Sequence, residues 1–124
     1  MAKIPGEEME KKILEAAQEL FLEKGYMATS TVDIAKKVGC NQALVHYYFR
    51  TKQNLFKQIY LQYVNSLVQL GRQNIQQCAS VTELVQEIIH LYFTFFTKYP
   101  KVPYFFVNEL IVSSEHRQMV KECF

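Results

Sequence analysis

Residues 29–52 read Thr-Ser-Thr-Val-Asp-Ile-Ala-Lys-Lys-Val-Gly-Cys-Asn-Gln-Ala-Leu-Val-His-Tyr-Tyr-Phe-Arg-Thr-Lys, and this stretch decides the fold. Its apolar positions predict a helix over Thr31–Val38, a reversal at Gly39 and a second helix over Gln42–Phe49. Glycine can adopt a positive φ, so the chain can turn back within a few residues. Two short helices around such a turn, with polar residues at the helix starts and cations at the exit, are typical of a helix-turn-helix that contacts DNA.

Capping residues support these boundaries. Ser30 followed by Asp33 fits the capping-box pattern, and Asn41 can cap the second helix. Thr51 can cap a longer helix, whose apolar period continues to Gly71. The sequence therefore specifies the helix starts around the turn with local hydrogen-bond acceptors.

Helical periodicity extends over the rest of the chain. Further helices are expected over Glu7–Lys24, from Ser80 or Val81 to Thr97, over Pro103–Ser113 after a Lys101–Pro103 connection, and onward from Ser114. We therefore expect an all-α fold. A three-helix DNA-binding head is expected in residues 1–50, and a helical effector-binding and dimerisation body in residues 51–124.

Composition excludes several classes of protein. The apolar share of 49% supports a folded core, and the polar first residues do not resemble a signal peptide. The most apolar region, Leu84 to Tyr99, is too short to cross a bilayer and contains Glu87 and His90. We therefore expect a cytoplasmic protein with no membrane partner.

The positive charge is concentrated on the helix-turn-helix. Residues 28–57 contain five cations and one acid, whereas residues 7–23 contain six glutamates and two lysines. Such a distribution suits a polyanion partner, although lysines also simply solvate helix faces.

Cys40, Cys78 and Cys123 are too widely spaced for a disulfide framework or a zinc site. They are expected to be structural thiols, with a redox role for Cys40 as the alternative.

The second short helix has the features of a recognition helix. At about 100° per residue, Val45 and Phe49 face inward, whereas Gln42, Ala43 and His46 face outward. The Gln42 amide can pair bidentately with adenine, and Ala43 can touch a thymine methyl group. The remaining expected DNA contacts are an apolar one from Leu44 and phosphate contacts from Thr29, Ser30, Thr31, His46, Tyr47 and Lys52. For Ser30, capping alone is an equally good interpretation.

These residues resemble a known family. Three segments carry the resemblance: Ile13-Leu14-x2-Ala17-x2-Leu20-Phe21-x3-Gly25, Asp33-Ile34-Ala35-Lys36-Lys37-Val38-Gly39, and Leu44-Val45-His46-Tyr47-Tyr48-Phe49-Arg50-Thr51-Lys52-x2-Leu55-Phe56. Together they resemble the DNA-binding head of the tetracycline-repressor (TetR) family over about residues 10–60. The resemblance implies a dimeric, ligand-responsive transcriptional regulator, usually a repressor, that binds an inverted-repeat operator. It also implies phosphate contacts from Thr29 or Ser30, His46, Tyr47, Tyr48 and Lys52.

The sequence departs from the family pattern in three places. The family commonly has tyrosine at the position of His46 and valine-serine at the positions of Cys40 and Asn41. Histidine can still donate to a phosphate and Asn41 can still cap, so both roles are retained. The family also usually continues for several more helices, the last two of which form the dimer interface. We expect this chain to lack them.

The body has an unusual density of aromatic residues between Tyr92 and Phe106. These rings can form the core, an apolar effector pocket, or a surface for further helices or a partner subunit. The expected pocket residues are Tyr60, Tyr63, His90, Tyr92, Phe93, Phe96, Tyr104 and Asn108.

Catalytic patterns are missing from the sequence, so we expect no enzyme, no metal site and no cofactor. The expected partners are operator DNA, an unidentified small-molecule effector and a second copy of the chain. A helical protein-interaction module that does not bind DNA is the alternative function.

Overall fold

The computed structural model describes residues 5–123, which form seven α-helices and no strand. The helices are α1 (Pro5–Lys24), α2 (Thr31–Val38), α3 (Gln42–Phe49), α4 (Lys52–Gln76), α5 (Val81–Lys98), α6 (Lys101–Val112) and α7 (Ser114–Glu122). The all-α fold expected from the sequence is confirmed. No helix in this part of the chain has both the length and the hydropathy that a membrane span requires.

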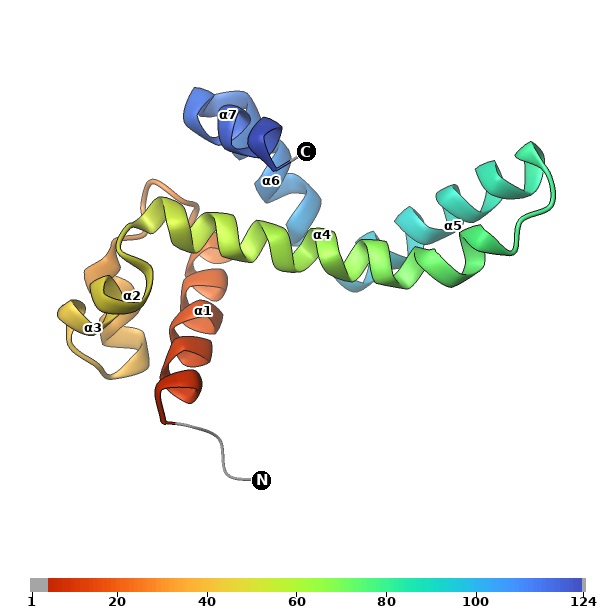
Figure 1. The fold of residues 1–124 in the computed structure, drawn as a ribbon. Helices are drawn as coiled ribbons and strands as arrows, with labels where there is room; N and C mark the ends of the chain where they lie inside the picture. The colour runs from red at the N-terminus through yellow and green to blue at the C-terminus, as the bar shows by residue number, and fades with distance from the viewer. Residues whose placement is uncertain (1–4, 124) are drawn as a thin grey trace.

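The long helix α4 organises the molecule (Figure 1). Helices α1, α2 and α3 pack together at its N-terminal end and form the head. Helix α5 returns beside the C-terminal half of α4, so the two form a projecting hairpin. Helices α6 and α7 turn back toward the head, where α6 packs against α1.

Local caps fix the helices of the head as the sequence predicts. The Ser30 side chain accepts from the Asp33 backbone N–H, and the Asp33 carboxylate accepts from the Ser30 backbone N–H. Gly39 has φ 83°, in the left-handed region that favours glycine. Asn41 and Thr51 accept from backbone N–H groups at the starts of α3 and α4. The turn between α2 and α3 is therefore specified by residues within a few positions of it.

Two expected helix boundaries are wrong, namely the end of α4 and the start of α6. Helix α4 does not stop at Gly71 but runs on to Gln76, because Gly71 is buried where Leu91 of α5 packs closely. A Cβ atom at Gly71 would lie 2.6 Å from Leu91 Cδ2, so this glycine permits close helix packing.

Helix α6 begins at Lys101, so the expected Lys101–Pro103 connection is helical. Pro103 is tolerated there because the first backbone N–H groups of a helix have no partner within it. Buried Val102 adds a packing contribution to this first turn.

A single hydrophobic core joins the head to α6. The buried apolar side chains of the head and of the adjoining start of α4 are Ile13, Ala16, Ala17, Phe21, Ile34, Ala35, Val45, Phe49, Leu55, Phe56 and Ile59. Phe56 also meets Phe105 and Phe106 of α6, at ring-centroid distances of 5.8 and 5.5 Å. Burying aromatic rings contributes strongly to stability, so these contacts hold the body against the head.

Candidate nucleic-acid interface

Helix α3 has one buried side and one exposed side. Val45 and Phe49 are 1% and 6% exposed, and they anchor the helix on the head core. The exposed residues of α3 are Gln42, Ala43, His46 and Tyr47, and we call them the α3 face. The inward and outward positions expected from the helical period are thus confirmed, while the DNA contacts of these residues stay predictions. Leu44 and Tyr48 are half-buried at its border.

The N-terminal ends of α2 and α3 are linked by side chains. Gln42 Nε2 donates a hydrogen bond to Thr31 Oγ1 at 2.9 Å. Asn41 Oδ1 accepts a hydrogen bond from the Ala43 backbone N–H at 2.6 Å. The side-chain NH2 of Asn41 takes no part in this bond. The side-chain amides of Asn41 and Gln42 are therefore both held by hydrogen bonds at the exposed start of α3.

The hydroxyl residues before α2 differ in their environment. Thr29 is 1% exposed, and its hydroxyl donates to the Gly25 carbonyl at 2.8 Å. The expected phosphate contact of its side chain is not possible in this conformation, because the hydroxyl is buried and already bonded. Ser30 is exposed and caps α2, and Thr31 is half-buried beside Gln42.

Lys52 does not present the free ammonium group expected at the start of α4. Its Nζ donates to the Tyr26 backbone carbonyl at 2.9 Å and lies 4.2 Å from the centre of the Tyr26 ring. Burial lowers the pKa of Lys52, and the negative charge of Glu109 partly opposes this shift. Lys52 thus ties the loop before α2 to α4. An ammonium group has three N–H donors, so two remain for a phosphate.

Ion pairs reduce the free positive charge of the head. Lys37 pairs with Glu19 at 3.0 Å, and Lys24 pairs with Asp33 at 3.2 Å. Hydrogen bonds from Ser30 and then from Lys24 lower the pKa of Asp33. Exposed ion pairs are worth little and are screened by salt, so these lysines can exchange partners when a polyanion approaches.

The two neighbouring tyrosines of α3 have different surroundings. Tyr47 is 75% exposed, and its ring contacts the half-buried Tyr48 ring edge-on at 5.1 Å. The Tyr47 hydroxyl is therefore carried on a ring supported from one side. This position suits a hydrogen bond to a DNA phosphate better than a contact inside the groove.

The residues expected to form an effector pocket are not gathered into one enclosed cavity in the described part of the chain. Tyr60 and Tyr63 are half-buried and pack edge-on against Phe106. The other expected pocket residues are exposed: His90, Tyr92, Phe93, Phe96, Tyr104 and Asn108. The reason is that the aromatic residues of α5 and α6 lie on both sides of their helices. Phe95, Phe105 and Phe106 enter the core, while the others face outward.

Comparison with known proteins decides the family. Residues 13–59 match the family model described as bacterial regulatory proteins, tetR family. This head belongs to the TetR family. The matched segment runs from α1 into α4 and contains the whole α2–turn–α3 unit, so the family resemblance expected from the sequence is confirmed.

Two relatives of the TetR head come from Staphylococcus aureus. The HTH-type transcriptional regulator QacR is 46% identical over 48 residues, which are 39% of this chain and 26% of QacR. The negative transcriptional regulator IcaR of the biofilm operon icaADBC is 34% identical over 67 residues, which are 52% of this chain and 36% of IcaR. The chain thus spans about a quarter to a third of the length of these relatives. Their names describe regulators rather than enzymes.

Solved structures extend the similarity beyond the TetR head. A transcriptional regulator from Aquifex aeolicus VF5 has a TM-score of 0.75 at 25% identity, covering 92% of this chain and 63% of that one. A HlyIIR mutant protein has a TM-score of 0.72 at 26% identity, covering 94% of this chain and 63% of that one. The helices after the TetR head therefore also have the fold of these proteins.

A buried polar cluster behind the TetR head has no counterpart in the sequence-based predictions. His116 of α7 is 1% exposed, and its Nδ1 lies 3.2 Å from Glu109 Oε2 of α6. Its ring stacks on Phe56 at 4.0 Å and meets the Tyr26 ring edge-on at 4.5 Å. Burial lowers the pKa of His116, and Glu109 partly opposes the shift. The sequence does contain a signal for this burial. His116 and apolar Met119 are three residues apart, which places both on one face of a helix.

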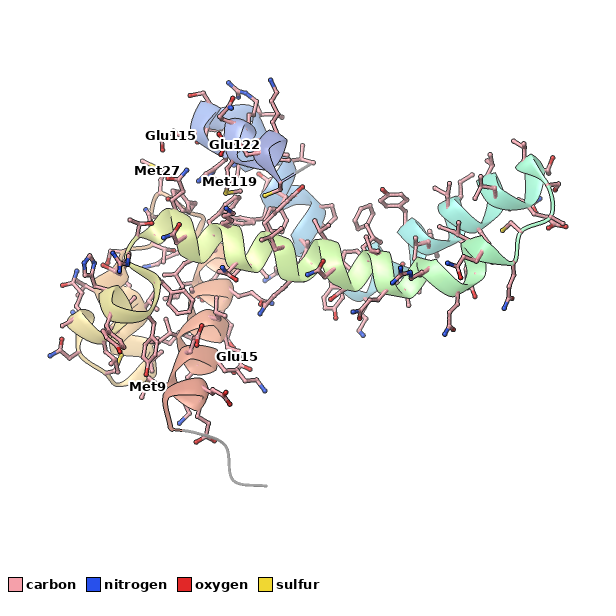
Figure 2. The ribbon with its side chains drawn as sticks, viewed as in Figure 1. Met9, Glu15, Met27, Glu115, Met119 and Glu122 are labelled. Atoms are coloured by element: carbon pink, nitrogen blue, oxygen red, sulfur yellow. The ribbon has the colours of Figure 1, made fainter. Side chains whose placement is uncertain are left out.

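The side chains of α7 lie close to this junction (Figure 2). Met119, Glu115 and Glu122 extend from α7. Residues of α4 and α7 line a polar groove of about 560 Å³, with Lys57 opposite these glutamates. Helix α7 is therefore held by buried His116 and Met119, while Glu115 and Glu122 stay exposed along the groove.

Proposed function

We propose that the protein is a sequence-specific DNA-binding transcriptional regulator that places α3 in the major groove. The observation that carries this proposal is the α3 face, on which an amide, a methyl group, an imidazole and a phenol are exposed on a helix anchored by buried Val45 and Phe49. A narrow helix with small and polar residues at its exposed start suits the width of the groove.

Each residue of the α3 face has a proposed role. Gln42 contacts a base edge, most favourably adenine, and Ala43 allows close approach and contact with a thymine methyl group. His46 and Tyr47 contact phosphates on the flanking strands. Ser30, Thr31, Lys52 and the half-buried Leu44 and Tyr48 support the edges of the interface, and Asn41 orients the first turn.

Dimerisation and effector control are the second part of the proposal. TetR-family regulators often bind operators as dimers and respond to small molecules. We propose that two heads contact successive major grooves about one helical turn apart, and that an effector in the body changes their separation. The similarity to the negative regulator IcaR supports repression as the mode of action. A regulator of this kind acts where the DNA is, so the proposed location is the cytoplasm. Residues 1–50 form the DNA-binding part in this proposal, and residues 51–124 form the effector-binding and dimerisation part.

Replacing Gln42 with alanine tests the role of the α3 face. We would select binding sites from a random duplex library at near-physiological salt and measure affinity by fluorescence anisotropy for the winning sequence and its single base-pair variants. Gln42→Ala is expected to relax the preference at one base pair by roughly 1–3 kcal/mol, because a bidentate amide contact is lost.

Gln69→Ala is the matched control, since Gln69 is an exposed glutamine of α4 remote from α3 in sequence. It should leave both affinity and preference unchanged. An unchanged base preference in Gln42→Ala contradicts the role of Gln42. No enrichment of any sequence by the folded protein contradicts the proposed function and favours a protein-interaction module.

A further inference from the structure

The hydrogen bond between Gln42 and Thr31 joins the two helices of the helix-turn-helix where both begin. Gln42 is the first residue of α3 and Thr31 is the first residue of α2. The two helices also pack on each other, and buried Ile34, Ala35 and Val45 belong to the same core. An exposed side chain of α3 is therefore tied to a rigid neighbour rather than left free in solvent.

The chemistry of the amide limits what Gln42 can present. A primary amide has one carbonyl oxygen and two N–H donors. One donor is engaged by Thr31 Oγ1, so the carbonyl oxygen and one N–H remain. These two groups match the N6 donor and the N7 acceptor that adenine exposes in the major groove. The bond to Thr31 is thus compatible with bidentate base recognition, and it restricts rotation of the amide.

We propose that Thr31 is a positioning residue, which orients the Gln42 amide before DNA binds and thereby sets the discrimination at one base pair. This inference rests on the proposed function of the α3 face. A flexible side chain loses rotamer freedom when it is immobilised at an interface, and a preformed hydrogen bond removes part of that loss beforehand. Thr31 acts here through Gln42. The Thr31 hydroxyl oxygen accepts from Gln42, so the hydroxyl can still donate its own proton to a phosphate.

Substitution of Thr31 separates positioning from a phosphate contact. Thr31→Val keeps the shape of the side chain but removes the oxygen, whereas Thr31→Ser keeps the oxygen. Thr31→Val is expected to reduce discrimination at the base pair contacted by Gln42 roughly 3- to 10-fold. Thr31→Ser is expected to restore most of it. Thr82→Val is the control, because Thr82 is an exposed threonine in the first turn of α5.

A double-mutant cycle with Gln42→Ala gives the decisive comparison. If Thr31 acts through Gln42, Thr31→Val has no further effect on discrimination in the Gln42→Ala background. If Thr31→Val instead lowers the affinity for all sequences equally, in the wild type and in the Gln42→Ala background, the positioning role is overturned. Thr31 then makes only a phosphate contact. A wild-type chain without any sequence preference overturns the proposed function and this inference together, so the two failures are distinguishable.

The free protein provides a readout that does not depend on DNA. The side-chain amide signal of Gln42 in a 15N NMR spectrum is identified by its loss in Gln42→Ala. In the wild type and in Thr31→Ser this signal is expected to show restricted motion, and in Thr31→Val the motion of a free exposed amide. Equal mobility in all three proteins overturns the inference, and unchanged backbone signals elsewhere show that Thr31→Val is folded.

Discussion

Phe56→Ala is expected to lower the free energy of unfolding by roughly 3–5 kcal/mol, the largest loss of stability that we predict for a single substitution. Phe56 is fully buried, and its ring contacts Tyr26, Phe105, Phe106 and His116. Removing the ring leaves a cavity between the head, α6 and α7. Urea unfolding followed by circular dichroism measures the effect.

Phe93→Ala is the matched control for this experiment. It makes the same chemical change at a ring that is 72% exposed on α5, so the expected change lies within about 0.5 kcal/mol. If the two substitutions cost the same, Phe56 does not join the head to the body in the way described. If only Phe56→Ala destabilises and both unfolding transitions remain single, the head and the body unfold as one unit.

Acidification from pH 7 to pH 5 is expected to destabilise the protein through His116. Burial depresses the pKa of His116 in the folded state below its ordinary value of 6.5. The unfolded chain therefore binds more protons between these two pKa values, and stability falls as the pH falls through this window. One histidine contributes at most about 1.4 kcal/mol per pH unit. Above pH 6.5 this contribution is constant.

The charged groups around His116 come from three helices. Glu109 of α6 and Glu115 of its own helix favour the protonated form, whereas Lys52 of α4 opposes it. Urea unfolding at several pH values measures the balance. His116→Gln should be less stable at pH 7, because the stack on Phe56 is lost, but should depend less on pH. His90→Gln, at an exposed histidine of α5, should keep the wild-type pH dependence. A gain in stability on acidification contradicts the depressed pKa and shows that Glu109 dominates.

The junction between head and body gives these two experiments a functional meaning. Lys52 reaches the Tyr26 carbonyl, Tyr26 contacts His116, and His116 lies beside Glu109 of α6. The loop before α2 and helix α4, on which α3 packs, thus contact α6 and α7 directly. In the proposed regulator, a change in the body can reach the head through this contact without any unfolding of α4.

Local features of the fold could be predicted from the sequence. Ser30, Asp33, Asn41 and Thr51 act on backbone groups within three residues, so pattern alone identifies the starts of α2, α3 and α4. The exposure of the α3 face follows from the helical period in the same way. The DNA contacts themselves depend on a partner and stay predictions.

Features set by packing between distant segments could not be predicted. Gly71 does not end α4, because Leu91 of the next helix packs against it. The Lys52 ammonium group is engaged by Tyr26, which lies 26 residues earlier in the chain. The aromatic residues of the body are divided between core and surface by the way α5 and α6 pack. Periodicity cannot reveal such contacts, since each depends on the mutual placement of whole helices.

The most direct test of the central claim is an NMR titration of the 15N-labelled protein with its selected duplex at near-physiological salt. The account predicts that the largest shifts in backbone amide signals occur over residues 41–47, with smaller shifts near Thr31 and Lys52 and almost none in α5. Shifts confined to α5–α7, with the signals of α3 unchanged, would contradict the placement of α3 in the major groove.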